Sequence, residues 1–162
     1  MKEMPVNQLN PKMKNVWRIS DALNLTIAFL FCFIPFVIVY AVEMLTWALI
    51  VALAVALVYV VALILVVVVL PPIRYARWRY ELSSDYLDIA RGIVWRKRFI
   101  IPFIRVQNTD TQQGPILRAF KLSSVTVSTA AGKHEIPGLD LEVAEQLRDK
   151  AAELARIAQE DV

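Results

Sequence analysis

The sequence is poor in the residue types that most catalytic and metal sites need. Among 162 residues it has one cysteine, Cys32, one histidine, His134, and four glycines. One cysteine excludes a disulfide within the chain, and a lone histidine has no second imidazole with which to complete a zinc site. The glycines form no phosphate-binding loop, and no Gly-x-Ser-x-Gly motif is present. The sequence therefore argues against an enzyme, and we expect neither a cofactor nor a metal.

The few residues that could take part in chemistry have simpler structural interpretations. Cys32 lies in an apolar run and is expected to act as a small buried hydrophobic residue. His134 lies in a short predicted strand, where we expect its side chain to be exposed. Asp85 and Asp88 could be read as paired carboxylates, but a turn and a strand edge account for them. No candidate catalytic residue follows from these positions.

The sequence also lacks the uniform basic character of a nucleic-acid-binding protein. The formal net charge is +3, and the basic residues are concentrated in residues 1–20 and 71–105. Residues 139–162 have the opposite sign, with seven acids against three basic residues. This division argues against nucleic acid as a partner.

Charge is almost absent from residues 22–70, where Glu43 is the one charged side chain. The apolar run on either side of it predicts two membrane spans, residues 22–42 and 46–70. As helices these would be about 31 and 37 Å long, against a hydrocarbon core of about 30 Å. A secretory signal peptide is the competing interpretation of the first span, but its apolar region would be shorter and a second span would not follow. We therefore expect an N-terminal segment at 1–21 and a transmembrane hairpin at 22–70.

The distribution of Lys and Arg around the spans predicts their orientation. Three basic residues precede the first span, three follow the second, and the connecting loop has only Glu43. The six residues are Lys12, Lys14, Arg18, Arg74, Arg77 and Arg79. By the positive-inside rule, both termini are cytoplasmic and the chain is a multi-pass protein of the bacterial plasma (inner) membrane.

The interior of the spans offers little for transport. Ion and substrate pathways in membranes need charged groups, and neither span contains one. Ala48, Ala52 and Ala56 repeat every four residues and form a small-residue stripe that lets helices approach closely. The stripe is a candidate helix-packing surface, toward the first span of the same chain or toward a partner chain.

Residues 71–162 predict one water-soluble, mainly-β domain. Pro71 and Pro72 are expected to end the second helix. Alternation and turn residues then predict strands at 78–82, 87–92, 93–101, 106–113, 123–130 and 134–136, with a helical turn at 116–120. Asp140 is a good N-cap for a final amphipathic helix. The apolar stripe of this helix is expected to cover the open end of a small barrel, with a coiled-coil partner as the alternative. The stripe consists of Ala144, Leu147, Ala151, Leu154 and Ala158.

Several short motifs in this domain resemble, in order and spacing, the YdbS-like bacterial PH domains, also called membrane-flanked domains. The motifs are Arg79-Tyr80-Glu81-Leu82, Leu87-Asp88-Ile89 with Gly92, Ile101-Pro102, Arg105-Val106-Gln107, Arg118 with Leu122, Val125-Thr126-Val127-Ser128-Thr129-Ala130 and Ile136-Pro137-Gly138-Leu139. The paired spans before them also fit the family. Lys121 and Ala131 depart from it, because each stands where the family usually has glycine.

The resemblance implies a seven-stranded PH-like barrel or sandwich with a C-terminal capping helix, attached to the transmembrane hairpin as a cytosolic module. It also implies a larger, paralogous PH-domain membrane protein as partner, and a role in defence against antimicrobial peptides. Self-association is the other partner that we consider. A small regulatory subunit of a transport or peptide-export complex is the alternative function.

The bilayer is the partner that the charges favour. The segment between the second span and the first strand is short, so basic residues of the domain lie near anionic headgroups, where each gains about 1 kcal/mol. The candidate lipid or partner contacts are Arg74, Arg77, Arg79, Arg96, Lys97 and Arg98. We therefore expect a non-catalytic module for assembly, lipid contact or both.

Overall fold

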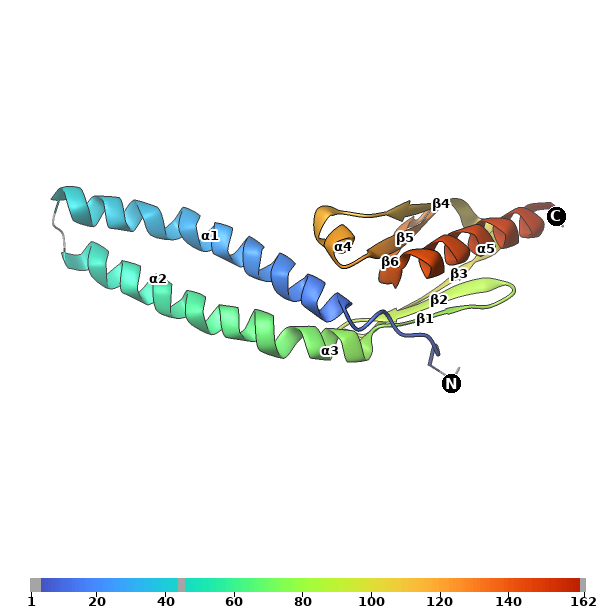
Figure 1. Cartoon of the computed structure of the whole chain (residues 1–162), viewed down its shortest axis with the longest axis horizontal. Helices are drawn as coiled ribbons and strands as arrows, with labels where there is room; N and C mark the ends of the chain where they lie inside the picture. The colour runs from blue at the N-terminus through green and yellow to red at the C-terminus, as the bar shows by residue number, and fades with distance from the viewer. Residues whose placement is uncertain (1–3, 44–45, 161–162) are drawn as a thin grey trace. The chain divides into compact units, whose positions relative to one another are not determined.

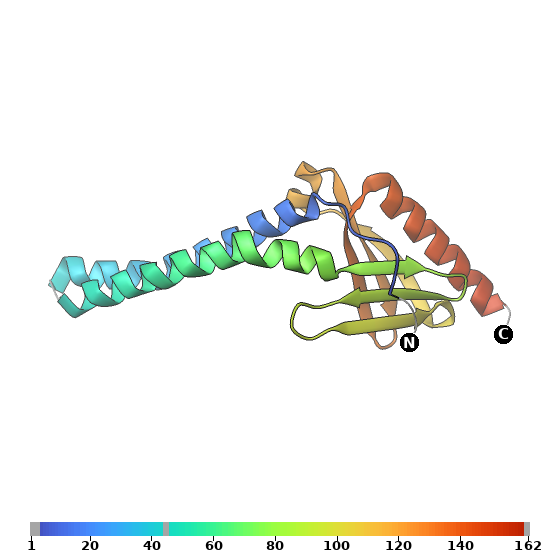
Figure 2. The ribbon, with the colours of Figure 1, turned by 90° about the horizontal axis from the view of Figure 1, so that it is seen from below.

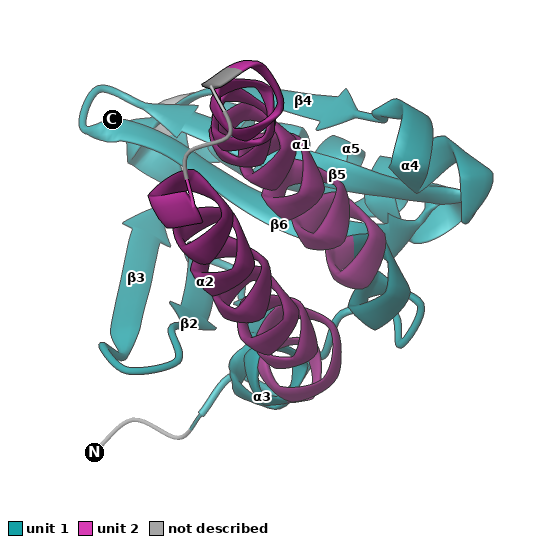
Figure 3. Cartoon of the chain, turned by 90° about the vertical axis from the view of Figure 1, so that its left-hand side faces the viewer, with its two compact units in different colours: residues 1–16, 73–162 teal, residues 17–72 magenta. Residues whose placement is uncertain are grey.

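The structure is a computed structural model that describes residues 4–43 and 46–160. The predicted break between the two spans lies at Val42-Glu43-Met44, so that Met44 falls outside the described residues. The chain divides into two compact units, which Figure 3 colours separately. Residues 17–72 form the helical unit, and residues 1–16 with 73–162 form the β unit.

The helical unit is built from apolar helices. Helix α1 covers Met13–Glu43 and helix α2 covers Thr46–Ile64, followed without a break by the π-helix η1, Leu65–Val69 (Figure 1). By length and composition, two helices of the described chain could cross a membrane. Phe29 stacks on Tyr59 with 4.2 Å between ring centroids, and the Tyr59 hydroxyl lies 3.0 Å from the Thr26 hydroxyl. Most large apolar side chains of these helices are exposed, as lipid-facing residues are. Cys32 was expected to be buried, but it is exposed as well.

The sequence predicted that Pro71 and Pro72 end the second helix, and this prediction is wrong. The helix continues as α3, Leu70–Arg77. The wider π turn ends at Leu70, whose N–H donates to the carbonyl of Leu65, so the prolines fall in the first turn of a new helical segment, where no N–H is needed. Pro71 has no N–H to donate to the carbonyl of Val67, four residues earlier. This carbonyl instead accepts a hydrogen bond of 3.0 Å from Nε of Arg18.

The β unit contains two three-stranded antiparallel sheets. The first runs β1 (Arg79–Leu82), β2 (Tyr86–Arg91) and β3 (Lys97–Pro102), and the second runs β4 (Val106–Gln112), β5 (Leu122–Thr129) and β6 (Gly132–Asp140). A 3₁₀ turn, η2 (Phe103–Arg105), joins the sheets, α4 (Pro115–Ala119) joins β4 to β5, and α5 (Leu141–Glu160) follows β6. The described residues thus form six strands, one fewer than the seven that the resemblance implied.

The core lies between the sheets and beneath α5. Fully buried residues come from both sheets and from η2; they include Leu87, Ile89, Phe103, Leu122, Val125, Val127 and Ile136. Helix α5 packs on β4, β5, β6 and η2, so it caps the β unit of its own chain, as predicted, by covering the second sheet and the turn before it. Within the predicted stripe, Ala144, Leu147 and Ala151 are buried, whereas Leu154 and Ala158 are half-buried. Ala155, which the predicted stripe did not include, is buried as well.

Two strand boundaries differ from the prediction by four residues, and the others by no more than two. The third strand begins at Lys97 instead of Ile93, because residues 92–96 form the loop between β2 and β3. The last strand extends to Asp140 instead of ending at Ile136. A register shift between Ser123 and Val125 of β5 lets β6 continue in spite of its proline and glycine.

The two departures from the family pattern have different outcomes. Lys121 has φ +57, so a lysine occupies a left-handed position that favours glycine, at a cost of the order of 1 kcal/mol. Ala131 carries no such strain, because the positive φ of the β5–β6 turn falls on Gly132. Both turns therefore keep the backbone that the fold requires.

The N-terminal segment packs on the β unit, which the sequence analysis did not anticipate. Asn7 exchanges two hydrogen bonds of 3.0 Å with the backbone of Tyr80 in β1 (Figure 2). Asn10 donates through its backbone N–H to Gly138 and through its side chain to both carboxylate oxygens of Asp140, at 2.9 and 2.8 Å. Leu9 is 2% exposed. The segment before the first helix is therefore part of the β unit.

Candidate functional site

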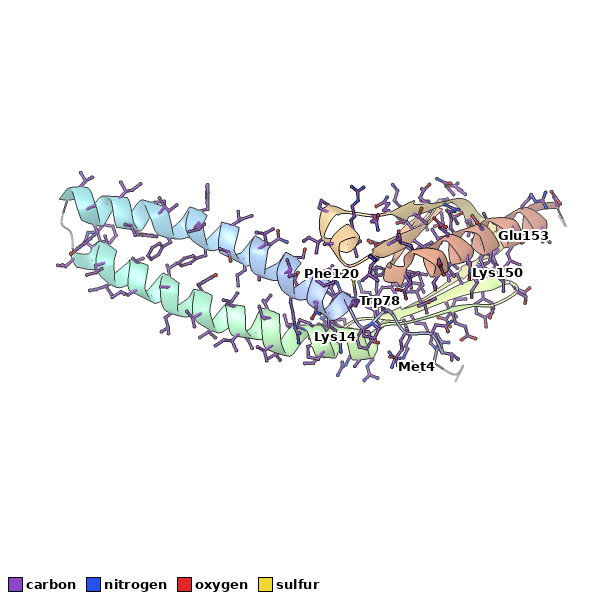
Figure 4. All side chains as sticks on the ribbon, in the orientation of Figure 1. Met4, Lys14, Trp78, Phe120, Lys150 and Glu153 are labelled. Carbon is purple, nitrogen blue, oxygen red and sulfur yellow. The ribbon has the colours of Figure 1, made fainter. Side chains whose placement is uncertain are left out.

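The basic residues predicted from the sequence gather around one pocket of about 400 Å³ in the β unit. Among the residues that the structure describes, ten line the pocket; six of these are Arg or Lys and none is acidic. The six are Arg77 from α3, Arg79 from β1, Arg91 from β2, Arg96 from the β2–β3 loop, and Lys97 and Arg98 from β3. Met4 of the N-terminal segment, which is labelled in Figure 4, also lines the pocket. Like-signed side chains that converge on a hollow form a site for an anion.

The register of the first sheet explains why these residues meet. Arg79 of β1 stands opposite Ala90 of β2, and Ala90 stands opposite Arg98 of β3. The three residues therefore lie on one face of the sheet. The neighbouring positions Tyr80 and Ile89 point to the other face and are buried in the core. Strand alternation thus brings Arg79 and Arg98 to one face, whereas Arg91 and Lys97 stand opposite each other at the end of the sheet, on the alternation of Ile89.

Arg98 forms an ion pair with a buried carboxylate of the neighbouring strand. Its Nη2 lies 2.6 Å from Oδ2 of Asp88, and its Nε is 3.1 and 3.0 Å from the two carboxylate oxygens. The hydrogen bond to Asp88 raises the pKa of Arg98 above its ordinary value. Asp88 is 2% exposed, so it is a buried ion-pair partner and not the strand-edge residue expected from the sequence. Arg98 is therefore a wall of the pocket with its charge largely compensated.

The remaining predicted residues occupy different places. Arg74 is exposed in the last turn of α3 and does not line the pocket. In α2, Ala48 is fully buried, Ala52 is 4% exposed and Ala56 is half-buried. The alanine stripe belongs to the helical unit and has no part in the basic pocket.

Arg91 and Met4 line the pocket but were missed in the sequence analysis. Arg91 had a usable signal, since it ends β2 opposite Lys97 and is one of a dense group of basic residues at 91–98. Met4 had none, because its position follows from the pairing of Asn7 with Tyr80, residues that are far apart in the sequence.

A second, larger groove of about 980 Å³ lies between β3 and the second sheet. Its lining is mostly apolar and includes Ile100 and Ile104, which are 47% and 48% exposed. The His134 ring lies in the same groove, 5.0 Å from the Phe99 ring. The sequence predicted an exposed strand residue, but His134 is half-buried against an aromatic ring.

The environment of His134 predicts a pH effect on stability. Burial lowers the pKa of His134 below 6.5, and the positive charge of Arg91 lowers this pKa further. The unfolded chain therefore binds more protons in this range, so stability should fall as the pH drops below about 6.5. Because the sequence has a single histidine, one imidazole resonance in an NMR titration gives the pKa directly. An Arg91→Gln variant should move this pKa back upward; a value at or above 6.5 in the parent chain would contradict the prediction.

The comparisons with known proteins agree with this fold. A family model described as "Bacterial PH domain" matches residues 19–155. The UPF0699 transmembrane protein YdbS of Bacillus subtilis (strain 168) is 36% identical over 162 residues, which is the full length of both chains. The UPF0699 transmembrane protein YdbT of the same organism is 27% identical over 81 residues, covering 48% of this chain and 16% of YdbT. No solved structure matches the chain.

Proposed function

The chain belongs to the bacterial PH domain family, as a membrane-associated relative of YdbS, and we propose that it is a non-catalytic module whose basic pocket binds anionic lipid headgroups. The observation that carries this proposal is the convergence of six basic side chains on one pocket, with no acidic side chain among its described lining residues. Arg is well suited to phosphate because its guanidinium donates two parallel hydrogen bonds. A volume of about 400 Å³ is within the range of small-molecule sites.

The chain itself supports a lipid as the source of the phosphate. Arg77 lines the pocket and is also the last residue of α3, which continues the apolar helix from Thr46. A helix rises 1.5 Å per residue, so Arg77 lies no more than about 10 Å along the helix from Leu70, where the apolar run ends. That distance keeps the pocket near the headgroup layer. With both termini cytoplasmic, as the positive-inside rule predicts, the lipids are those of the inner leaflet.

Reversing two charges of the pocket should remove bound anionic lipid. Arg96 and Lys97 are exposed, so Arg96→Glu with Lys97→Glu leaves the core intact. At about 1 kcal/mol per basic residue near a membrane surface, losing two such charges lowers affinity for phosphatidylglycerol at least about 30-fold. Native mass spectrometry of the full chain, released from detergent with phosphatidylglycerol or phosphatidylcholine, measures the retained lipid.

The matched control is Lys133→Glu with Lys150→Glu, which makes the same change of net charge at exposed positions outside the pocket. This control should keep phosphatidylglycerol bound. Equal loss of lipid in both double variants, or equal retention of phosphatidylcholine and phosphatidylglycerol by the parent chain, would contradict a specific pocket.

Assembly with a larger PH-domain membrane protein is a second candidate function, and the groove beside β3 favours it. The groove exposes Ile100 and Ile104 next to an edge strand, which is an arrangement that accepts an additional chain. The similarity to part of YdbT supports a partner of related fold. Purification in mild detergent tests it: recovery of the chain alone, with neither a partner nor a second copy, would contradict assembly.

Two further suggestions receive less support. The transport-subunit alternative has no charged residue in residues 22–42 and 46–70 with which to form a pathway. The role in defence against antimicrobial peptides rests on the family resemblance, and the sensitivity of a strain lacking the chain to such peptides tests it.

A further inference from the structure

The loop between β2 and β3 ends in an apolar tip. Val94 and Trp95 are each 81% exposed, which places them among the most exposed large hydrophobic residues of the described chain. Exposed apolar residues are expected on the apolar helices, but Val94 and Trp95 lie outside these helices. A soluble surface rarely leaves a tryptophan uncovered without a use for it.

Basic residues surround the tip on both sides. Arg91 precedes the loop, Arg96 and Lys97 follow it, and no acidic residue occurs between residues 89 and 109. Arg91, Arg96 and Lys97 also line the basic pocket. Apolar residues at the tip and cations behind it form a surface that complements the bilayer, where hydrocarbon lies beneath a layer of phosphate.

The loop is attached to the end of the membrane helix. The Arg77 guanidinium donates a hydrogen bond to the carbonyl of Ile93, one residue before the tip. Ala76 and Gly92 line the basic pocket together, so the loop and the last turn of α3 are neighbours within the β unit (Figure 2). Since α3 continues the second apolar helix, the tip lies close to the point where the chain leaves the membrane.

The loop turns back tightly on itself at Gly92. Gly92 has φ +124, and a Cβ at this position would collide with the carbonyl oxygen of Trp95. The turn therefore requires glycine, and it sets Val94 and Trp95 at the outer end of the loop.

We propose that Val94 and Trp95 insert into the interfacial layer of the bilayer that holds the apolar helices. The proposal rests on the proposed function, because the same bilayer supplies the headgroups for the basic pocket. Insertion lets Trp95 occupy the depth that tryptophan prefers in membranes. Arg96 and Lys97 then lie at the level of the phosphates. The pocket and the tip together orient the sheet relative to the membrane surface.

A depth measurement on the full chain tests the insertion. In a Cys32→Ser background, Val94→Cys carries an environment-sensitive fluorophore, and the protein is reconstituted in vesicles of phosphatidylcholine and phosphatidylglycerol with nitroxide-labelled lipid. The matched control is Ser84→Cys, an exposed position in the β1–β2 turn. It lies at the opposite end of β2, about 20 Å away. We expect quenching and a blue shift at position 94 and neither at position 84.

The outcomes separate this proposal from the proposed function. No quenching at position 94, while charge reversal of Arg96 and Lys97 still removes bound phosphatidylglycerol, overturns insertion alone. A blue shift without quenching by lipid means that a protein covers the tip, which also overturns it. Adding Trp95→Ser should remove most of the quenching at position 94. Unchanged quenching in that variant contradicts a role for the tip, and an unchanged circular dichroism spectrum excludes misfolding as the cause of a loss.

Discussion

Replacing Phe103 with alanine should lower the free energy of unfolding of the β unit by about 3–5 kcal/mol. Phe103 is fully buried in η2, the turn that joins the two sheets, and α5 packs on this turn. Its N–H also donates a hydrogen bond of 3.1 Å to the carbonyl of Asp85. A small domain has about 5–15 kcal/mol in total, so the cavity removes a large part of its stability.

Ile104 provides the control for this prediction. It is the next residue and is 48% exposed, so Ile104→Ala should change stability by no more than about 0.5 kcal/mol. Denaturant unfolding of the full chain in nanodiscs, followed by near-ultraviolet circular dichroism, measures both variants. Similar losses for the two variants would mean that Phe103 is not the central core residue of this turn.

The ion pair between Arg98 and Asp88 should respond asymmetrically to mutation. Replacing Arg98 with glutamine leaves the carboxylate of Asp88, which is 2% exposed, buried without its cationic partner. Replacing Asp88 with alanine leaves Arg98, whose side chain is 30% exposed and can turn into water. Breaking a buried pair is most damaging when the charge that remains cannot be solvated. The Arg98 variant should therefore be much the less stable of the two.

The double variant completes this experiment. Arg98→Gln with Asp88→Ala should be more stable than Arg98→Gln alone, because the orphaned carboxylate is gone. The midpoints of thermal unfolding of the three variants in nanodiscs give the order. This account of the pair would be contradicted if the double variant were less stable than both single variants. It would also be contradicted if the Asp88 variant were less stable than the Arg98 variant.

Much of the architecture follows from local sequence patterns. The long apolar runs predict the two helices, and alternation predicts strands such as β1 and β5 because each side of a sheet meets a different environment. The patterns fail where distant contacts decide the outcome. The helix passes Pro71 because a π turn and Arg18 accommodate the proline, and the N-terminal segment packs because Asn7 finds Tyr80.

The candidate site was predictable as a charge cluster but not as a pocket. Residues 91–98 are visibly basic in the sequence, and alternation places most of them on a predicted strand, residues 93–101. The sequence alone could not separate the roles of these cations. Arg98 is held by Asp88 through a diagonal contact between strands, whereas Arg96 and Lys97 are exposed beside the hollow. The pairing of β2 with β3, which decides which cation meets Asp88, makes this distinction.

The pairing of the first residues with the last strand has a consequence for biogenesis. Asn10 and Asp140 are separated by 130 residues, and both membrane helices emerge from the ribosome between them. At typical rates of translation, the N-terminal segment waits on the order of ten seconds for its site on β6. During that interval both apolar helices have left the ribosome while the β unit is still incomplete. The β unit can therefore close only after the whole helical unit has been synthesised.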